Sequence, residues 1–212
     1  MFLVRHGETE WNLQRRYQGR SDSPLTERGV AQARAIGRLL AGLPGIASAG
    51  IISSPIGRAR STAELVGEHL ALSAALQLDE RLCELSLGSW DGLTYREIEM
   101  RAPGVFDGDG RHEWYFRSPD GERYDAFAAR LAVWLEEWDE RKVLVVVTHG
   151  IVTRVLRGLY AGLPRAVALT LPVPQDKLYR LCGGLIEQLP VLSPAAAPVE
   201  MLRGAADRGR SR

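Results

Sequence analysis

The chain has 212 residues, of which 45% are hydrophobic and 25% charged, as in a globular protein with a substantial core. Its 27 Lys and Arg residues balance 26 Asp and Glu residues, so charge gives no basis for binding nucleic acid or an anionic membrane. Two cysteines far apart, Cys83 and Cys182, make neither a disulfide framework nor a CxxC motif. With no signal-peptide pattern and no membrane-length apolar run, we expect a cytoplasmic protein.

The first part of the chain is expected to alternate strands with helices. Residues 2–4 have the pattern of a short buried strand, and a helix opens at Thr26 and stops at Gly42. A second strand is expected at 49–53. A helix should then start at 54–55, because proline is tolerated in the first turn of a helix.

Residues 86–121 differ from the rest of the chain because glycine and proline recur throughout them. We interpret residues 93–121 as an inserted cap with one short helix, which Thr94 and Glu97 begin as a capping box. A long helix is predicted over 122–140, with large apolar side chains along one face.

The strongest strand signal is the run 143–148, whose β-branched residues are typical of a parallel strand buried on both faces. A helix should follow to about Tyr160. Further strands are expected at 167–171 and 178–181, and Gly183-Gly184 should turn a hairpin into 185–189.

This alternation predicts an α/β fold with a mainly parallel central sheet. We expect a single domain over 1–190. The remainder, 191–212, is rich in Ala, Pro, Gly and Arg and is expected to be a flexible tail, with a docked helix at 199–203 as the alternative.

Polar residues follow three of the expected strands at the point where each strand ends. They are Arg5-His6-Gly7, Ser53-Ser54-Pro55 with Arg58 close behind, and Thr148-His149-Gly150. In a parallel sheet these ends would meet, together with two helix N-termini. Arginine and helix N-termini bind phosphate, and glycine lets the backbone approach a ligand closely. The pattern therefore predicts a phosphate site.

Phosphate binding alone does not need two histidines, whereas phosphoryl transfer needs a nucleophile such as His6. Arg5, Arg58 and a protonated His149 would neutralise charge on the transferring group. A carboxylic acid in an apolar setting would have a raised pKa and could protonate the leaving alkoxide. Glu84, flanked by Cys83 and Leu85, is the candidate for this role, and Glu8 is its rival.

Five blocks together resemble the histidine phosphatase superfamily, also called the phosphoglycerate mutase-like family. The resemblance covers roughly residues 1–185, and the blocks are RHGETEWN at 5–12, YQGRSDSPLTERGVAQA at 17–33, SSPIGRARSTAE at 53–64, LCELSLGSWDG at 82–92 and VVTHG at 146–150. The tripeptide RHG is a weak signal alone, but five blocks in one order are specific.

The resemblance implies a three-layer α/β/α sandwich with an inserted cap, no metal and no cofactor. It implies that His6 becomes phosphorylated and that Glu84 first protonates the leaving group and later activates water. The remaining phosphate-pocket and ligand-contact residues that it implies are Arg5, Asn12, Gln18, Gly19, Arg58, His149 and Gly150. Gly7 joins the candidate ligand contacts on other grounds, because a glycine there lets the backbone approach a ligand closely.

Two enzyme functions and one binding function fit these residues. The Arg-Tyr-Tyr-Gly block of the family's cofactor-dependent mutases is absent after Glu84 and the insertion is short, which favours hydrolysis of phosphomonoesters. The alternatives are phosphoglycerate mutase-type phosphoryl transfer and a phospho-ligand binding module without turnover. The expected partner is a small phosphate ester, with no nucleic acid and no membrane. The oligomeric state is not indicated.

The motifs above do not distinguish one phosphate ester from another as the substrate. Arg15 and Arg16 are candidates to hold a second anionic group, and His69 is expected to be structural. The cap residues that could line the mouth of the pocket, or simply pack, are Trp90, Tyr95, Arg111, His112, Trp114, Tyr115 and Arg117.

Overall fold

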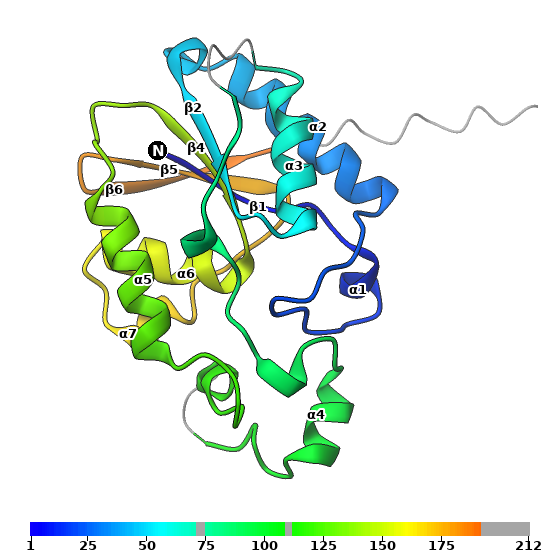
Figure 1. Ribbon diagram of the computed structural model, residues 1–212. Coiled ribbons are helices and arrows are strands. Elements are labelled where there is room, and N and C mark those ends of the chain that lie inside the picture. Colours follow the sequence, from blue (N-terminus) through cyan, green and yellow to red (C-terminus); the bar gives the residue numbers. More distant parts are fainter. Residues whose placement is uncertain (71–74, 109–111, 192–212) are drawn as a thin grey trace, which may run out of the picture.

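The computed structural model describes residues 1–70, 75–108 and 112–191, and these residues contain one mixed sheet of six strands (Figure 1). The strand order is β3-β2-β4-β1-β5-β6. β3, β2, β4 and β1 run parallel, while β5 and β6 are antiparallel at one edge. The strands are β1 (Phe2–Arg5), β2 (Gly50–Ser53), β3 (Gln77–Leu78), β4 (Leu144–Thr148), β5 (Lys177–Cys182) and β6 (Leu185–Pro190).

Seven α-helices lie in the described part of the chain. They are α1 (Glu10–Leu13), α2 (Glu27–Ala41), α3 (Gly57–Gly67), α4 (Tyr95–Arg101), α5 (Tyr124–Glu136), α6 (Gly150–Tyr160) and α7 (Arg165–Ala168). Helices α2 and α3 cover one face of the sheet, and α5 and α6 cover the other (Figure 1). The expected three-layer α/β/α architecture is confirmed.

The two cores follow from the alternation of side chains along the central strands. On β1, Phe2 and Val4 belong to the core under α2 and α3, whereas Leu3 belongs to the core under α5 and α6. On β4, Val145 and Val146 divide in the same way. Because both faces are buried, the continuous apolar run seen in the sequence is required here.

Several local signals operate as expected. Thr26 caps α2 by accepting from the Gly29 N–H. The capping box of α4 forms, since Thr94 Oγ1 accepts from Glu97 N and Glu97 Oε2 accepts from Thr94 N. Gly183 and Gly184 have φ of 56° and 76°, the left-handed values that a tight hairpin turn needs at both positions.

One expected strand does not form, and two expected helices have other bounds. Residues 167–171 form no strand, because Pro164 starts the short helix α7 and Ala168 packs against α6 at Gly158. The helix expected from 54–55 begins at Gly57, where Asp22 accepts from the Arg58 N–H. The helix expected over 122–140 is the shorter α5.

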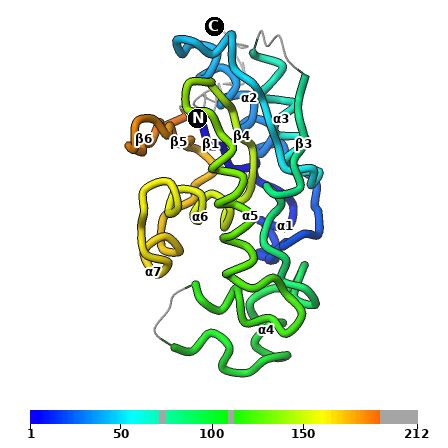
Figure 2. The backbone as a smooth tube through the Cα atoms, turned by 60° about the vertical axis from the view of Figure 1, so that its left-hand side comes forward, coloured from blue at the N-terminus to red at the C-terminus, as the bar shows by residue number. Residues whose placement is uncertain are grey.

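Residues 93–121 contain α4 and the 3-10 helix Glu113–Phe116, and contribute no strand to the sheet in their described part. Figures 1 and 2 place α4 beyond one end of the sheet, away from the stacked layers. The tail expected over 191–212 lies outside the described residues except for Val191. Among the helices described, none has the length and apolar character needed to cross a membrane.

Candidate active site

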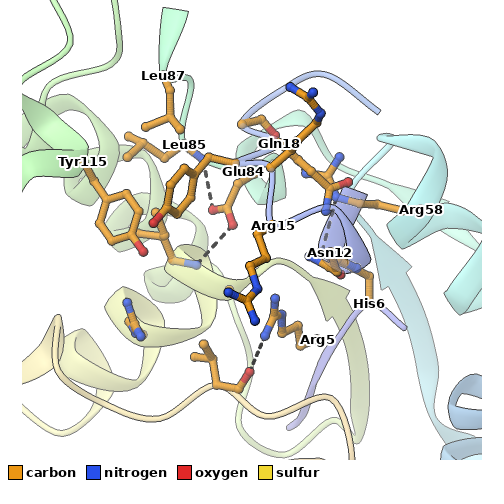
Figure 3. A pocket seen from close by; sticks show the side chains of 17 residues that line it. Arg5, His6, Asn12, Arg15, Gln18, Arg58, Glu84, Leu85, Leu87 and Tyr115 are labelled. Carbon is orange, nitrogen blue, oxygen red and sulfur yellow. Dashed lines mark hydrogen bonds between the residues drawn. The ribbon is translucent and has the colours of Figure 1, made fainter. Parts of the chain in front are cut away.

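The three polar strand ends meet as expected. Arg5 on β1 lies opposite Thr148 on β4, and Ser53 on β2 lies opposite Val147 on the other side of β4. A cavity of about 470 Å³ opens at this edge (Figure 3). Its walls are formed by Arg5, His6, Asn12, Arg15, Arg16, Tyr17, Gln18, Gly19, Arg58, Glu84, Leu85, Leu87, Tyr115, Gly150, Ile151, Arg154 and Val173.

His6 is held in the form that a nucleophile requires. Its Nδ1 lies 2.8 Å from the Gly7 carbonyl oxygen, and because that oxygen can only accept, Nδ1 carries the proton. The unprotonated Nε2 then accepts from Arg58 Nε at 3.3 Å. Burial, followed by the charges of Arg58 and Arg5, holds the pKa of His6 well below its ordinary value. His6 is therefore neutral near pH 7, with an unprotonated Nε2 whose lone pair faces the Arg58 Nε–H.

Arg58 is almost fully buried and its guanidinium is fixed by main-chain acceptors. NH1 donates to the Ser21 carbonyl at 2.6 Å and NH2 donates to the Gly19 carbonyl at 2.8 Å. Asp22 accepts from the Arg58 main-chain N–H at 3.0 Å and balances the charge. The loop that follows α1 thus positions the guanidinium group of Arg58, whose backbone belongs to α3.

His149 packs beside His6, with ring centroids 5.3 Å apart. Its Nε2 lies 2.8 Å from Ser54 Oγ, while Nδ1 has no hydrogen-bond partner among the described residues. Burial and the nearby Arg58 charge hold the pKa of His149 well below its ordinary value. The sequence expectation of a protonated His149 is therefore not met in this pocket, because a positive charge there would be both desolvated and next to arginines.

Glu84 lies in the pocket wall at the N-terminus of α6. Its Oε1 accepts from the main-chain N–H groups of Leu85 and Val152, and its Oε2 accepts from that of Ile151. The setting is thus rich in N–H donors, rather than the apolar one that its neighbours in sequence indicated. The rival Glu8 lies outside the cavity wall, where it accepts from Thr26 Oγ1 and faces Arg28.

Arg5 is tied to a segment that the sequence analysis did not single out. Its NH1 donates to the Val173 carbonyl at 2.5 Å, and its buried Nε has no partner among the described residues. Two residues on, Gln175 Nε2 donates to the His6 carbonyl at 3.3 Å and to Asn12 Oδ1 at 3.0 Å. The only sequence signal for Gln175 is an amide just before a strand.

The remaining predicted contact residues divide into two groups. Asn12, Gln18, Gly19 and Gly150 line the cavity. Gly19 has φ of 51°, and a Cβ there would lie 1.6 Å from Asp91 Oδ1, so only glycine fits. Gly7 does not line the cavity. Its missing side chain leaves room for helix α2, since a Cβ would lie 2.4 Å from the Gly29 carbonyl oxygen.

Of the cap residues considered, Tyr115 reaches the cavity wall. Trp90 and Trp114 are buried in the core under α5 and α6, which is the packing alternative. Among the rest, Tyr95 stacks on Phe106 and His112 stacks on Tyr115, whereas Arg111 lies outside the described residues. Arg15 and Arg16 both line the cavity.

The described residues hold no group of three or more His, Cys, Asp or Glu side chains placed to bind a metal ion. What they do hold is a neutral histidine with an unprotonated ring nitrogen, two fixed guanidinium groups and a carboxyl group at a helix N-terminus. Such a set can bind a phosphoryl group, accept it on nitrogen and exchange a proton with an oxygen beside it.

Comparison with known proteins agrees with this geometry. Residues 1–183 match the family model of the histidine phosphatase superfamily, branch 1. The chain is 38% identical over 172 residues to the "Probable phosphoglycerate mutase GpmB" of Photorhabdus laumondii, covering 77% of this chain and 75% of the relative.

Two solved structures are similar to the chain over most of their length. The alpha-ribazole phosphatase of Shigella flexneri superposes with a TM-score of 0.72 at 25% identity, over 91% of this chain and 95% of that one. A mycobacterial glucosyl-3-phosphoglycerate phosphatase, solved in complex with VO3, gives 0.66 at 30% identity over 85% and 90%. The chain therefore belongs to branch 1 of the histidine phosphatase superfamily.

Proposed function

We propose that this protein is a metal-independent phosphomonoesterase that hydrolyses small phosphorylated metabolites through a phosphohistidine at His6. The observation that carries the proposal is the orientation of His6, whose Nδ1–H is fixed on the Gly7 carbonyl while Nε2 faces the cavity beside Arg58. In a neutral imidazole of that tautomer the Nε2 lone pair lies beside Arg58, so a phosphoryl group held by Arg5 and Arg58 would take the place of the Arg58 N–H as its partner.

In the first half-reaction, His6 Nε2 attacks phosphorus as the ester P–O bond breaks. Arg5 and Arg58 stabilise the charge that spreads over the equatorial oxygens. In this scheme His149 Nδ1, which is buried beside His6 and has no partner among the described residues, donates a hydrogen bond to one of these oxygens. The leaving alkoxide takes a proton from protonated Glu84, and the three main-chain N–H groups then hold the carboxylate that forms, so the products are a free alcohol, a phosphohistidine and a carboxylate.

In the second half-reaction, the Glu84 carboxylate takes a proton from a water molecule that attacks phosphorus. The P–N bond breaks, inorganic phosphate leaves, and Glu84 is again a carboxylic acid. Residues 93–121 act in this scheme as a cap over the leaving-group side of the cavity, to which they contribute Tyr115.

The second candidate is a mutase, in which the phosphohistidine returns its phosphoryl group to a second substrate hydroxyl instead of water. The name of the Photorhabdus relative favours this candidate. The phosphatase names of the two solved structures favour hydrolysis. The absence of the mutase block after Glu84 supports hydrolysis independently.

The test is turnover of p-nitrophenyl phosphate in the presence of EDTA, with trapping of the phosphorylated protein from a radiolabelled ester. We expect activity that vanadate inhibits and an acid-labile, base-stable label on wild type but not on His6→Asn. The matched control is His69→Asn, because His69 lies near Gly37 on α2, away from the cavity. Full activity of His6→Asn would overturn the proposal.

Hydrolysis and mutase activity are separated by incubating the protein with 3-phosphoglycerate and a catalytic amount of bisphosphoglycerate. A phosphatase releases phosphate and leaves the isomers unequilibrated. Rapid exchange between the 2- and 3-isomers without phosphate release would select the mutase.

A further inference from the structure

The cavity carries more positive charge than a phosphoryl group uses. Five arginines line it against a single carboxylate, Glu84, counted over the described residues. Arg5 and Arg58 serve the phosphoryl group. Arg16 is already engaged, since its NH1 donates to Glu97 Oε2 at 3.0 Å and to the Gly92 carbonyl at 2.8 Å. This leaves Arg15 and Arg154 without a role in the proposed reaction.

Arg15 is unusual in its backbone as well as its charge. Its φ is 56°, and it is the non-glycine residue with a left-handed backbone in the described part of the chain. Such a conformation costs about 1 kcal/mol or more for a residue with a Cβ. Its side chain has no hydrogen bond or ion pair to any described residue, yet it lines the cavity. Left-handed strain in a cavity-lining residue points to a functional use.

Arg154 approaches the same cavity from helix α6, one turn after Gly150. Its Nε donates to the Leu171 carbonyl at 2.8 Å, which fixes the guanidinium at the cavity wall. The charge of Arg154 also acts on the Tyr115 hydroxyl of the cap, where it opposes the rise in pKa that burial causes. Arg154 and Arg5 lie close enough for their positive charges to repel each other. A bound anion would relieve this repulsion.

The cavity also has room beyond the phosphoryl pocket. Its volume of about 470 Å³ is that of a site for a whole small metabolite, rather than for a phosphate ion alone. Figure 3 shows Arg15, Glu84 and Tyr115 reaching into this one cavity together with Arg5. The two spare arginines thus share a wall with the proton donor, on the side where the alcohol part of an ester would lie.

We propose that Arg15, Arg154 and the Tyr115 hydroxyl form a second anion-binding subsite. The preferred substrates are then phosphomonoesters whose alcohol part carries another acidic group, either a carboxylate or a second phosphate. This inference rests on the proposed hydrolysis only for its kinetic readout. The subsite itself is a binding site, because guanidinium groups pair with carboxylate and phosphate alike.

The first experiment compares kcat/KM for three glycerol-based esters with the same phosphorylated carbon. Glycerol 3-phosphate has a neutral alcohol part, 3-phosphoglycerate adds a carboxylate, and glycerol 1,3-bisphosphate adds a second phosphate. We expect wild type to prefer at least one acidic ester by about tenfold or more, the effect of one charge-assisted hydrogen bond. Which of the two it prefers tells a carboxylate from a phosphate subsite.

The second experiment measures the same preference in Arg15→Gln and Arg154→Gln. The ratio of kcat/KM for the acidic ester to that for glycerol 3-phosphate should fall by about tenfold in each variant. Arg38→Gln on the exposed side of α2 removes the same charge outside the cavity and should keep the wild-type ratio. Arg15→Gly should lower the ratio while relieving the backbone strain, which excludes unfolding as the cause.

The corresponding phosphonates bind without turnover, so calorimetry with them measures the subsite independently of hydrolysis. Tighter binding of the acidic phosphonates that both variants abolish would support the subsite even if p-nitrophenyl phosphate were not hydrolysed. Hydrolysis of p-nitrophenyl phosphate, combined with equal kcat/KM for all three esters or an unchanged ratio in both variants, would overturn the subsite and leave the proposed function standing.

Discussion

The side chain of Gln175 joins the main chain of His6 to the side chain of Asn12, across more than 160 residues of sequence. Its amide Nε2 is 3.3 Å from the His6 carbonyl oxygen and 3.0 Å from Asn12 Oδ1. This leaves the Asn12 side-chain N–H groups to face the cavity that Asn12 lines. Gln175 therefore holds the nucleophile's backbone and one phosphate-site amide in a fixed relation.

The segment that carries Gln175 is itself held in place by hydrogen bonds to Pro172. Buried Arg157 donates through NH2 to the Pro172 carbonyl at 2.6 Å, and Tyr179 on β5 donates to the same oxygen at 2.8 Å. The Arg157 guanidinium lies 3.8 Å from the centre of the Tyr179 ring. Because Val173 in this segment accepts from Arg5, the segment orients both a phosphate ligand and the backbone of the nucleophile.

We predict that Gln175→Leu lowers kcat by about tenfold, roughly the effect of one lost hydrogen bond of 1–1.5 kcal/mol, with a smaller change in KM. The readout specific to positioning is the rate at which labelled phosphohistidine accumulates in a rapid quench. Gln188→Leu on the exposed face of β6 makes the same chemical change away from the cavity and should leave both quantities unaltered. An unchanged phosphorylation rate in Gln175→Leu would show that the bridge is only structural.

We predict that Ser54→Ala weakens catalysis through His149. A Ser54 hydroxyl that donates to His149 Nε2, 2.8 Å away, leaves the ring proton on Nδ1, which has no partner among the described residues. Alanine removes that constraint on the tautomer. The expected result is a kcat lowered by about tenfold and an altered pH dependence of kcat, which Ser54→Thr should restore to near wild type. A wild-type pH profile in Ser54→Ala would contradict this role.

How much of this could be read from sequence depends on how local each signal is. Arg5 ends a strand, and His6, Arg58 and His149 come soon after one, so the parallel register of β1, β4 and β2 brings the four residues together. Gln175 and Arg154 act through contacts with distant segments, and no local pattern marks them. The surroundings of Glu84 are not predictable for the same reason, since two of its three N–H donors come from α6, more than 60 residues later.

The strand expected at 167–171 does not form, for a related reason. Val167 and Leu169 alternate as strand residues do, but the geometry is decided by Pro164 and by Ala168, which fits against Gly158 of α6. A Cβ on Gly158 would lie 2.4 Å from the Ala168 Cβ, so this contact is a pairing of two small residues. Such a pairing becomes visible only once the helices are packed.

We predict that the protein loses stability as the pH falls below about 6.5, the ordinary pKa of histidine. Burial holds the pKa values of His6 and His149 well below that value in the native state. Between the ordinary pKa and the depressed one, the unfolded chain binds protons that the native protein does not. The free energy of unfolding should therefore fall by up to about 1.4 kcal/mol per pH unit for each histidine.

Urea denaturation at pH 7.0, 6.0 and 5.5 tests this pH dependence. His149→Asn removes one of the two buried groups, so it should reduce the slope by about half below pH 6.5. His69→Asn is the control outside the cavity. A slope that His149→Asn leaves unaltered would mean that His149 is already protonated in the native protein.

We predict, last, that Gly7 is required for packing and that alanine there destabilises the fold. A Cβ on Gly7 would lie 2.4 Å from the Gly29 carbonyl oxygen, and one on Gly29 would lie 2.0 Å from the Glu8 carbonyl oxygen. Both neighbours are main-chain atoms, so relief requires the start of α2 to move away from β1. We expect Gly7→Ala to cost about 1–3 kcal/mol of unfolding free energy in urea denaturation.

The matched control is Gly67→Ala at the end of α3, where a Cβ would meet no atom within 4 Å. Alanine has the higher helix propensity, so this variant should be as stable as wild type or more stable, by up to about 1 kcal/mol. Gly7 would instead act mainly as a ligand contact if Gly7→Ala kept wild-type stability but lost phosphate binding. Because Gly7 lies behind the cavity wall, we expect stability and activity to fall together.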